Sequence, residues 1–107
     1  MTAKWYEEAQ RKIGKDDEIL KAYEGRMDGT FGYITISNKR MMFLHEKGLF
    51  RQTVDLVLDL PYNQLGKISH VSDRTMDITE KTGEHHTFKT DIIKVSKIEK
   101  LLNEHLE

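Results

Sequence analysis

The chain has 107 residues, and its 17 lysines and arginines against 18 aspartates and glutamates give a formal net charge of −1. The length suits one domain, and the balanced charge excludes the strongly basic footprint of a general nucleic-acid-binding protein. Cysteine is absent, which excludes disulfide frameworks, thiolate zinc sites and cysteine nucleophiles. The N-terminus lacks the apolar stretch of a signal peptide, and the longest apolar run, residues 41–44, is far shorter than a membrane span. We therefore expect a cytoplasmic protein.

The first fifteen residues predict an amphipathic helix. Its apolar residues recur at spacings of three and four, near one stripe: Trp5, Tyr6, Ala9 and Ile13. Thr2 is a candidate N-cap, and Gly14 occupies the place of a C-terminal glycine. Trp5 and Tyr6 are large aromatic anchors on a short element, so they are candidate interface residues. They either pin the helix to its own domain, which we favour slightly because a short free helix is marginal in water, or dock into a neighbouring protomer.

The next part of the chain predicts seven short strands joined by tight turns. The expected strands are residues 18–25, 31–37, 40–45, 54–60, 67–71, 75–79 and 84–89. Gly25 is expected to end the first strand, Asn38 to form a turn with positive φ, and Pro61 to end the fourth strand. The third strand is apolar on both faces, which predicts a central position. The fourth alternates, which predicts one inward row of four residues: Val54, Leu56, Leu58 and Leu60.

Residues 91–106 predict a second amphipathic helix, with Thr90 or Asp91 as its cap. Its apolar stripe contains Ile92, Val95, Ile98, Leu102 and Leu106, widened by Ile93 and Leu101. Consecutive strands joined by tight turns form an antiparallel meander rather than a parallel sheet. The predicted architecture is mainly β, with seven strands packed as two sheets or as a partly open barrel whose mouth the second helix covers.

One stretch of the chain carries a family signature. A hydrophobic strand, residues 33–37, is followed by Asn38, Lys39 and Arg40 and then by a second hydrophobic strand, residues 41–44. This order resembles the "hydrophobic strand, T-N-K-R, hydrophobic strand" signature of bacterial pleckstrin-homology-like (PH-like or GRAM-like) domains. Ser37 stands where threonine is commoner. The later segments also follow the family order, so the resemblance covers roughly residues 19–106.

The resemblance implies a fold and a class of function. The fold is a split barrel of about seven antiparallel strands capped by the C-terminal helix, with a helical extension at residues 1–16 and the PH-like domain at residues 17–107. The implied function is a non-catalytic binding module without a cofactor. Some bacterial members form homo-oligomers, so the expected partner is a second copy of the chain or another protein.

Specific phosphoinositide binding is not favoured by the sequence. The family relatives that bind such lipids collect several cations in the loop between the first two strands. Here that loop, residues 25–30, contains Arg26 and the acidic Asp28, and Lys21 could add only one more cation. A polyphosphate site needs multiple charge-assisted donors.

The turn after the third strand is a more prominent candidate. Lys47 and Arg51 flank two apolar residues, Leu49 and Phe50. Such a tip can dip into a membrane interface, with the cations at anionic headgroups. It can also contact a second protomer, or simply fold back onto the barrel rim as core. Lys47, Leu49, Phe50 and Arg51 are therefore candidate lipid- or partner-binding residues.

Catalytic and metal-binding signatures are not found. The histidines share no ligand spacing, and His85 and His86 are adjacent in a strand and so face opposite sides. No serine or cysteine nucleophile motif is present. Asp55 and Asp59 share one face of a strand, which is typical of a solvated surface. We expect no catalytic residues, no metal and no cofactor. An enzyme or small-ligand carrier is the third and least favoured function, which a deep apolar pocket with converging polar groups would support.

Overall fold

The computed structural model describes residues 3–48 and 53–106 of the chain. The predicted cap Thr2 and three residues of the predicted tip, Leu49, Phe50 and Arg51, lie outside the described residues. The elements in chain order are α1 (Lys4–Ile13), β1 (Ile19–Met27), β2 (Thr30–Ser37), β3 (Arg40–Lys47), β4 (Thr53–Pro61), the 3₁₀ turn η1 (Tyr62–Gln64), β5 (Leu65–Ser72), β6 (Thr75–Glu80), β7 (His85–Lys89) and α2 (Val95–Asn103).

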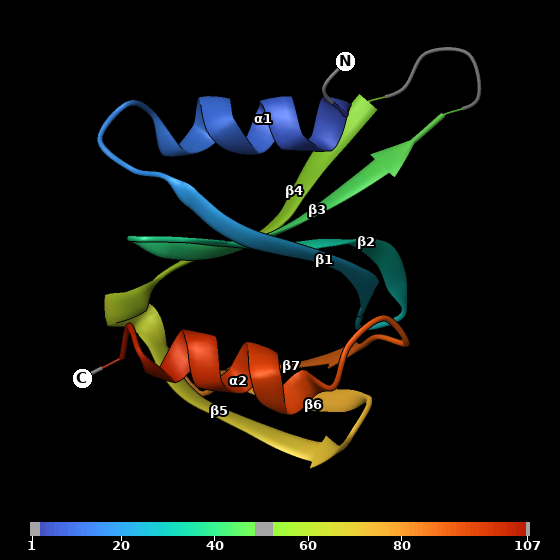
Figure 1. Cartoon of the computed structure of the whole chain (residues 1–107), viewed down its shortest axis with the longest axis vertical. Helices are drawn as coiled ribbons and strands as arrows, with labels where there is room; N and C mark the ends of the chain where they lie inside the picture. Colours follow the sequence, from blue (N-terminus) through green and yellow to red (C-terminus); the bar gives the residue numbers. More distant parts are fainter. Residues whose placement is uncertain (1–2, 49–52, 107) are drawn as a thin grey trace.

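The strands form one antiparallel sheet with the order β4-β3-β2-β1-β7-β6-β5. Figure 1 shows the two helices on opposite sides of β1 and β2, with α1 above and α2 below. The predicted fold class, a mainly β split barrel with a C-terminal and an extra N-terminal helix, is confirmed. No helix in the described part of the chain is both long and apolar enough to cross a bilayer.

The main core contains residues from all seven strands and from α2. At its centre the rings of Phe43 and Phe88 meet edge to face, with centroids 6.2 Å apart and planes at 70°. Gly25 and Gly32 face each other in the β1–β2 register. A Cβ atom on Gly25 would lie 2.5 Å from Cζ of Phe88, and one on Gly32 would lie 2.9 Å from Cε2 of Phe43. The glycine pair therefore makes room for the aromatic pair.

The first turn of the sheet differs from the prediction. Gly25 does not end β1, which continues to Met27. The turn is instead formed by Asp28 and Gly29, which have φ values of 51° and 88°. Asn38 is in a turn as predicted, but it is not among the described residues with positive φ. Its turn is held by Asp17, which accepts hydrogen bonds from the Ser37 hydroxyl at 2.7 Å and the Asn38 N–H at 2.9 Å.

A second core lies between α1 and the outer face of the sheet. Its buried residues are Ala9, Met42 and Leu44, and the half-buried residues packed on it are Trp5, Ile13, Ile19, Val54 and Leu56. Strand β3 is thus buried on both faces, as predicted, because Met41 and Phe43 belong to the main core while Met42 and Leu44 belong to the second core. In the order of the sheet, β3 is next to the edge strand rather than central.

A bulge in β4 corrects the predicted inward row. Leu58 pairs with Phe43 while Leu56 pairs with Leu44, so Val57 is an extra residue in β4. An extra residue reverses the faces of the residues that follow it. As a result Leu56 packs on the second core and Leu58 packs on the main core, and the four predicted residues are divided two and two. Val57 itself is 47% exposed.

The C-terminal helix is shorter than predicted. Val95, Ile98 and Leu102 are buried as expected, but Ile92 precedes the helix and is 59% exposed. The N-cap is Lys94, without a side-chain hydrogen bond, so the predicted caps Thr90 and Asp91 are wrong. The Thr90 hydroxyl instead accepts the Ile92 N–H at 3.2 Å and donates to the carbonyl of Glu24 at 2.8 Å. It joins the segment before α2 to β1.

Candidate functional site

Four neighbouring strands place one row of side chains on the outer face of the sheet. The register pairs Arg26 with Phe31, Arg26 with Lys89, and Lys89 with Thr75, so the row runs through β2, β1, β7 and β6. The residues next to the two cations, Met27 and Phe88, are buried in the main core. Since side chains alternate between faces along a strand, Arg26 and Lys89 face outward.

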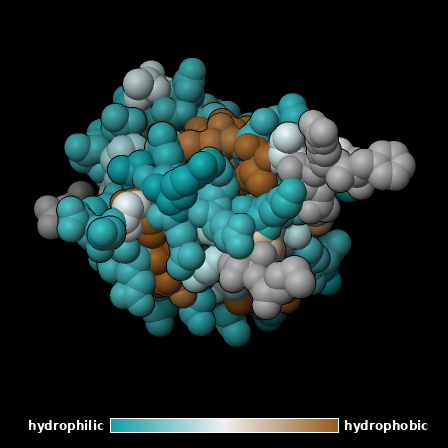
Figure 2. Space-filling view, turned by 90° about the horizontal axis from the view of Figure 1, so that it is seen from above, coloured by the Kyte–Doolittle hydropathy of each residue, from teal (hydrophilic) through white to brown (hydrophobic). Residues whose placement is uncertain are grey.

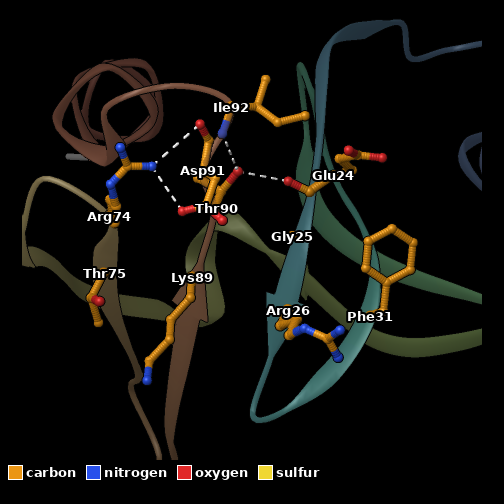
Figure 3. Close-up of a pocket in the computed structure, with 10 residues that line it drawn as sticks. All are labelled: Glu24, Gly25, Arg26, Phe31, Arg74, Thr75, Lys89, Thr90, Asp91 and Ile92. Atoms are coloured by element: carbon orange, nitrogen blue, oxygen red, sulfur yellow. Dashed lines mark hydrogen bonds and ion pairs between the residues drawn. The ribbon is translucent and has the colours of Figure 1, made fainter.

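Two hollows adjoin this row. The first has a volume of about 510 Å³. It is lined by the residues of the row, by Glu24 and Arg74, and by residues 90–92, as Figure 3 shows. The second has about 550 Å³ and extends from the same two cations toward Asp28 and Gly29. In Figure 3 the charged ends of Arg26 and Lys89 lie at the end of the first hollow away from the Arg74–Asp91 pair. The two cations thus lie where the hollows meet.

The cations of the site differ in how they are paired. The Arg74 guanidinium lies 2.8 Å from the Asp91 carboxylate. The Arg26 guanidinium lies over the Phe31 ring, 5.7 Å from its centroid, and donates a long hydrogen bond of 3.4 Å to the Gly29 carbonyl. Among residues 3–48 and 53–106 neither Arg26 nor Lys89 has a carboxylate partner. Arg26 and Lys89 are directly opposite each other where β1 pairs with β7. Like charges in such positions are destabilising, so this pair weakens the joint between β1 and β7.

The joint between β1 and β7 is short and is extended by side chains. The two strands pair at only two positions, Arg26 with Lys89 and Met27 with Phe88. Beyond them, the Asp28 N–H donates to the Thr87 carbonyl at 2.8 Å, and the Asp28 carboxylate accepts the Thr87 N–H at 2.9 Å. Asp28 therefore continues the pairing of the two strands by one further position.

His86 links this joint to the next strand. Its Nδ1 lies 3.1 Å from the Asp28 carboxylate and its Nε2 lies 2.7 Å from the Glu80 carboxylate. Partial burial lowers the pKa of His86, but the hydrogen bonds with Glu80 and Asp28 outweigh it and raise the pKa. The hydrogen bond from His86 lowers the pKa of Glu80. His86 thus connects Asp28, in the turn after β1, with Glu80, at the end of β6.

We expect the stability of the fold to depend on the charge of His86. Its pKa is raised on folding, so its contribution is fully present below the ordinary value of 6.5 and is lost as the pH rises through the folded-state value. The free energy of unfolding should fall by about 1 kcal/mol over this range. Urea unfolding between pH 5.5 and 9 measures it. This dependence of the free energy of unfolding on pH should be absent in His86→Gln and kept in His105→Gln. An unchanged pH dependence in His86→Gln would contradict the role given to His86.

Glu80, Glu84 and His86 place three ligand-type atoms within 4.8 Å of one another. The sequence analysis did not anticipate this group, because the two glutamates and the histidine meet only across the β6–β7 hairpin. Both nitrogens of His86 already bond to carboxylates, and Glu84 is exposed. We assign no metal to this group.

The predicted tip is described only at its start. Lys47 is exposed, and its ammonium lies 2.9 Å from the Asp55 carboxylate. This ion pair crosses from β3 to β4. The roles predicted for Lys47 and for the rest of the tip stay predictions.

The N-terminal helix packs on its own chain. The Trp5 ring stacks on the Tyr33 ring, with centroids 4.2 Å apart and planes at 10°, and the backbone N–H of Trp5 donates to the Glu46 carboxylate at 2.9 Å. Tyr6 contacts Trp5 edge to face at 5.6 Å. The face of the molecule that α1 covers is mostly hydrophilic, with smaller hydrophobic areas (Figure 2). An interface role for Trp5 and Tyr6 stays a prediction.

The outer-face row was missed by the sequence analysis as a set. Arg26 was considered only with the loop 25–30, and Lys89 not at all. Each is a polar residue beside a buried one in a strand, which is a common pattern and carries no signal of its own. Their proximity depends on the register of β1 and β7, which are 63 residues apart at this pair.

A family model described as a bacterial PH domain matches residues 13–104, which is most of the chain. The matched range begins at the last residue of α1, so nearly all of that helix lies outside it. A search of curated proteins found no match.

Proposed function

The chain belongs to the bacterial PH domain family, and from that premise we propose that it is a non-catalytic binding module that self-associates through the free edge of β4. PH domains are in general interaction modules that bind proteins or lipids. The partner proposed is a second copy of the chain, which would add its own β4 to the sheet. Strand addition of this kind supplies backbone hydrogen bonds without a dedicated pocket.

The position of β4 in the sheet carries this proposal. It is the terminal strand of the order, and no strand within the described residues pairs with its outer edge. It is nine residues long, Thr53–Pro61, which is ample for a ladder of hydrogen bonds. Val57 lies near its middle and is one of four exposed large hydrophobic residues in the described chain. An unpaired edge with an exposed apolar side chain favours pairing with another edge.

Charge is compatible with a two-fold arrangement. An antiparallel pair centred on Val57 would place Asp55 opposite Asp59 of the second copy. Each carboxylate already has a cation on its own chain: Lys47 lies 2.9 Å from Asp55, and Arg40 lies 3.0 Å from Asp59. The two ion pairs reduce the repulsion that bare carboxylates would cause at this position.

Light scattering after size exclusion tests the proposal. The protein at about 100 µM should have a mass near twice 12.6 kDa, and Val57→Lys should return it to the monomer mass, because a lysine on an edge strand opposes pairing. Val71→Lys is the matched control, since Val71 is 64% exposed on the other edge strand, β5. A monomer at all concentrations, or a dimer lost equally in both variants, would contradict the proposal.

A second candidate is contact with an anionic membrane through the tip that begins at Lys47. The sequence favours it through Leu49 and Phe50 between Lys47 and Arg51. Salt-sensitive co-sedimentation with anionic liposomes, without a change in mass in solution, distinguishes this function from self-association.

A further inference from the structure

We propose that the first outer-face hollow binds an organic carboxylate, with the carboxylate group between Arg26 and Lys89 and an apolar group against Phe31 and Ile92. This site is independent of the β4 edge and of the tip. Four features of the hollow support this assignment: unpaired cations, exposed apolar residues, mixed charge and size.

The unpaired cations supply the anchor. Arg26 and Lys89 are direct neighbours across the β1–β7 joint, and neither contacts a carboxylate within the described part of the chain. Figure 3 shows both charged groups at the end of the hollow away from the Arg74–Asp91 pair, with the Lys89 ammonium on the β7 side and the Arg26 guanidinium turned toward Phe31. A carboxylate between them would be held by the planar guanidinium, which the Phe31 ring already orients, and by the Lys89 ammonium once this exposed side chain turns toward Arg26. It would also remove the repulsion between the two cations.

The apolar residues supply a second contact. Large exposed hydrophobic side chains are few in the described residues: Phe31, Val57, Val71 and Ile92. Two of these four, Phe31 at 43% and Ile92 at 59% exposed, line this one hollow. In Figure 3 they lie on adjoining sides of it, above and beside the β1 backbone at Gly25. Apolar area beside unpaired cations is typical of a site for an amphiphilic ligand.

The mixed charge selects one carboxylate rather than a polyanion. The carboxylates of Glu24 and Asp91 also line the first hollow, and Asp28 lines the second. Asp91 is paired with Arg74 and Asp28 with His86, but Glu24 has no cation partner among the described residues. A polyphosphate or an anionic membrane would bring negative charge against these groups. A ligand with a single carboxylate can place its one negative charge at Arg26 and Lys89, away from these groups.

The volume limits the ligand to a small group. About 510 Å³ is within the range of small-molecule pockets, roughly 300–1,000 Å³. A small organic acid and the C-terminal residue of a peptide share the required chemistry, a free carboxylate beside an apolar side chain. The experiment therefore uses one probe of each source.

Two-dimensional ¹H–¹⁵N NMR titration of the whole chain with 3-phenylpropionate tests the proposal. The amide signals of residues 24–31 and 89–92 should shift together and saturate. The amide analogue, 3-phenylpropionamide, should bind at least about tenfold more weakly, because it lacks the charge. Lys89→Gln and Arg26→Gln should each weaken binding of the acid by about tenfold. Lys67→Gln, an exposed lysine of β5, is the matched control and should leave it unchanged.

The variants are compared only after thermal unfolding shows that each is folded. A tripeptide with a free C-terminal phenylalanine, titrated beside the small acid, tells which source the site prefers, and binding of either supports the proposal. Equal binding of acid and amide would overturn it. The proposal would also be overturned if Lys89→Gln bound the acid as tightly as the natural chain, or if inorganic phosphate bound more tightly than the acid. The absence of any localised signal shift up to about 50 mM of either probe would overturn it as well.

Discussion

Alanine at Gly32 is expected to lower the free energy of unfolding by about 3 kcal/mol, the upper range for overfilling a packed core. Its Cβ would meet the Leu44 carbonyl oxygen and the Phe43 ring. Alanine at Gly25 should cost a similar amount, because its Cβ would lie 2.5 Å from both the Lys89 carbonyl oxygen and the Phe88 ring. Neither backbone oxygen can move without breaking the sheet.

Urea unfolding followed by circular dichroism measures both variants. Gly66→Ala is the matched control, since it is also a strand glycine but its Cβ would come no closer than 3.0 Å to Thr79. We expect it to cost less than about 1 kcal/mol. A Gly32→Ala protein as stable as the natural chain would show that the aromatic pair does not depend on the two glycines.

Alanine at Trp5 is expected to lower the free energy of unfolding by about 2 kcal/mol, because the ring is half-buried rather than fully buried. The loss would remove the stack on Tyr33 and uncover part of the second core above Met42 and Leu44. Hydrogen exchange should accelerate in α1 and much less in β5–β7, which contribute no residue to that core among the described residues.

The control for this prediction is Tyr6→Ala, which removes a neighbouring ring on the same helix that does not stack on the sheet. It should cost less than Trp5→Ala. Light scattering is measured on the same samples. If Trp5→Ala left stability unchanged but lowered the mass of an oligomer, Trp5 would act in a partner interface rather than in its own domain.

The order of elements was readable from the sequence because each strand is short, β-branched or aromatic, and bounded by a turn. The run at residues 41–44 is apolar without alternation, and this predicted a strand buried on both faces. The sequence did not say what covers its outer face. That is α1, and its packing depends on Trp5 meeting Tyr33, which is 28 residues away.

The alternation of apolar residues in β4 was not enough to predict which face each of them occupies. One valine and three leucines at every second position predict a single inward row. A bulge cannot be recognised from such a pattern. Only the pairing with β3 reveals that Val57 is inserted, with Leu56 and Leu58 on opposite faces. Similarly, residues 91–94 read as the first turn of a helix, but Thr90 bonds to Glu24 and Ile92 and holds that segment against β1.

By itself, the sequence of this chain determined the number and order of the strands, the two helices and the resemblance to the bacterial PH domain family. These depend on local periodicity and turn residues, which act over a few positions. Only the tertiary structure decided that Arg26 and Lys89 are neighbours, that Gly25 and Gly32 accommodate two phenylalanine rings, and that α1 covers its own sheet. Each of these results from strand register and packing between residues distant in the chain, and single-residue preferences carry no information about register.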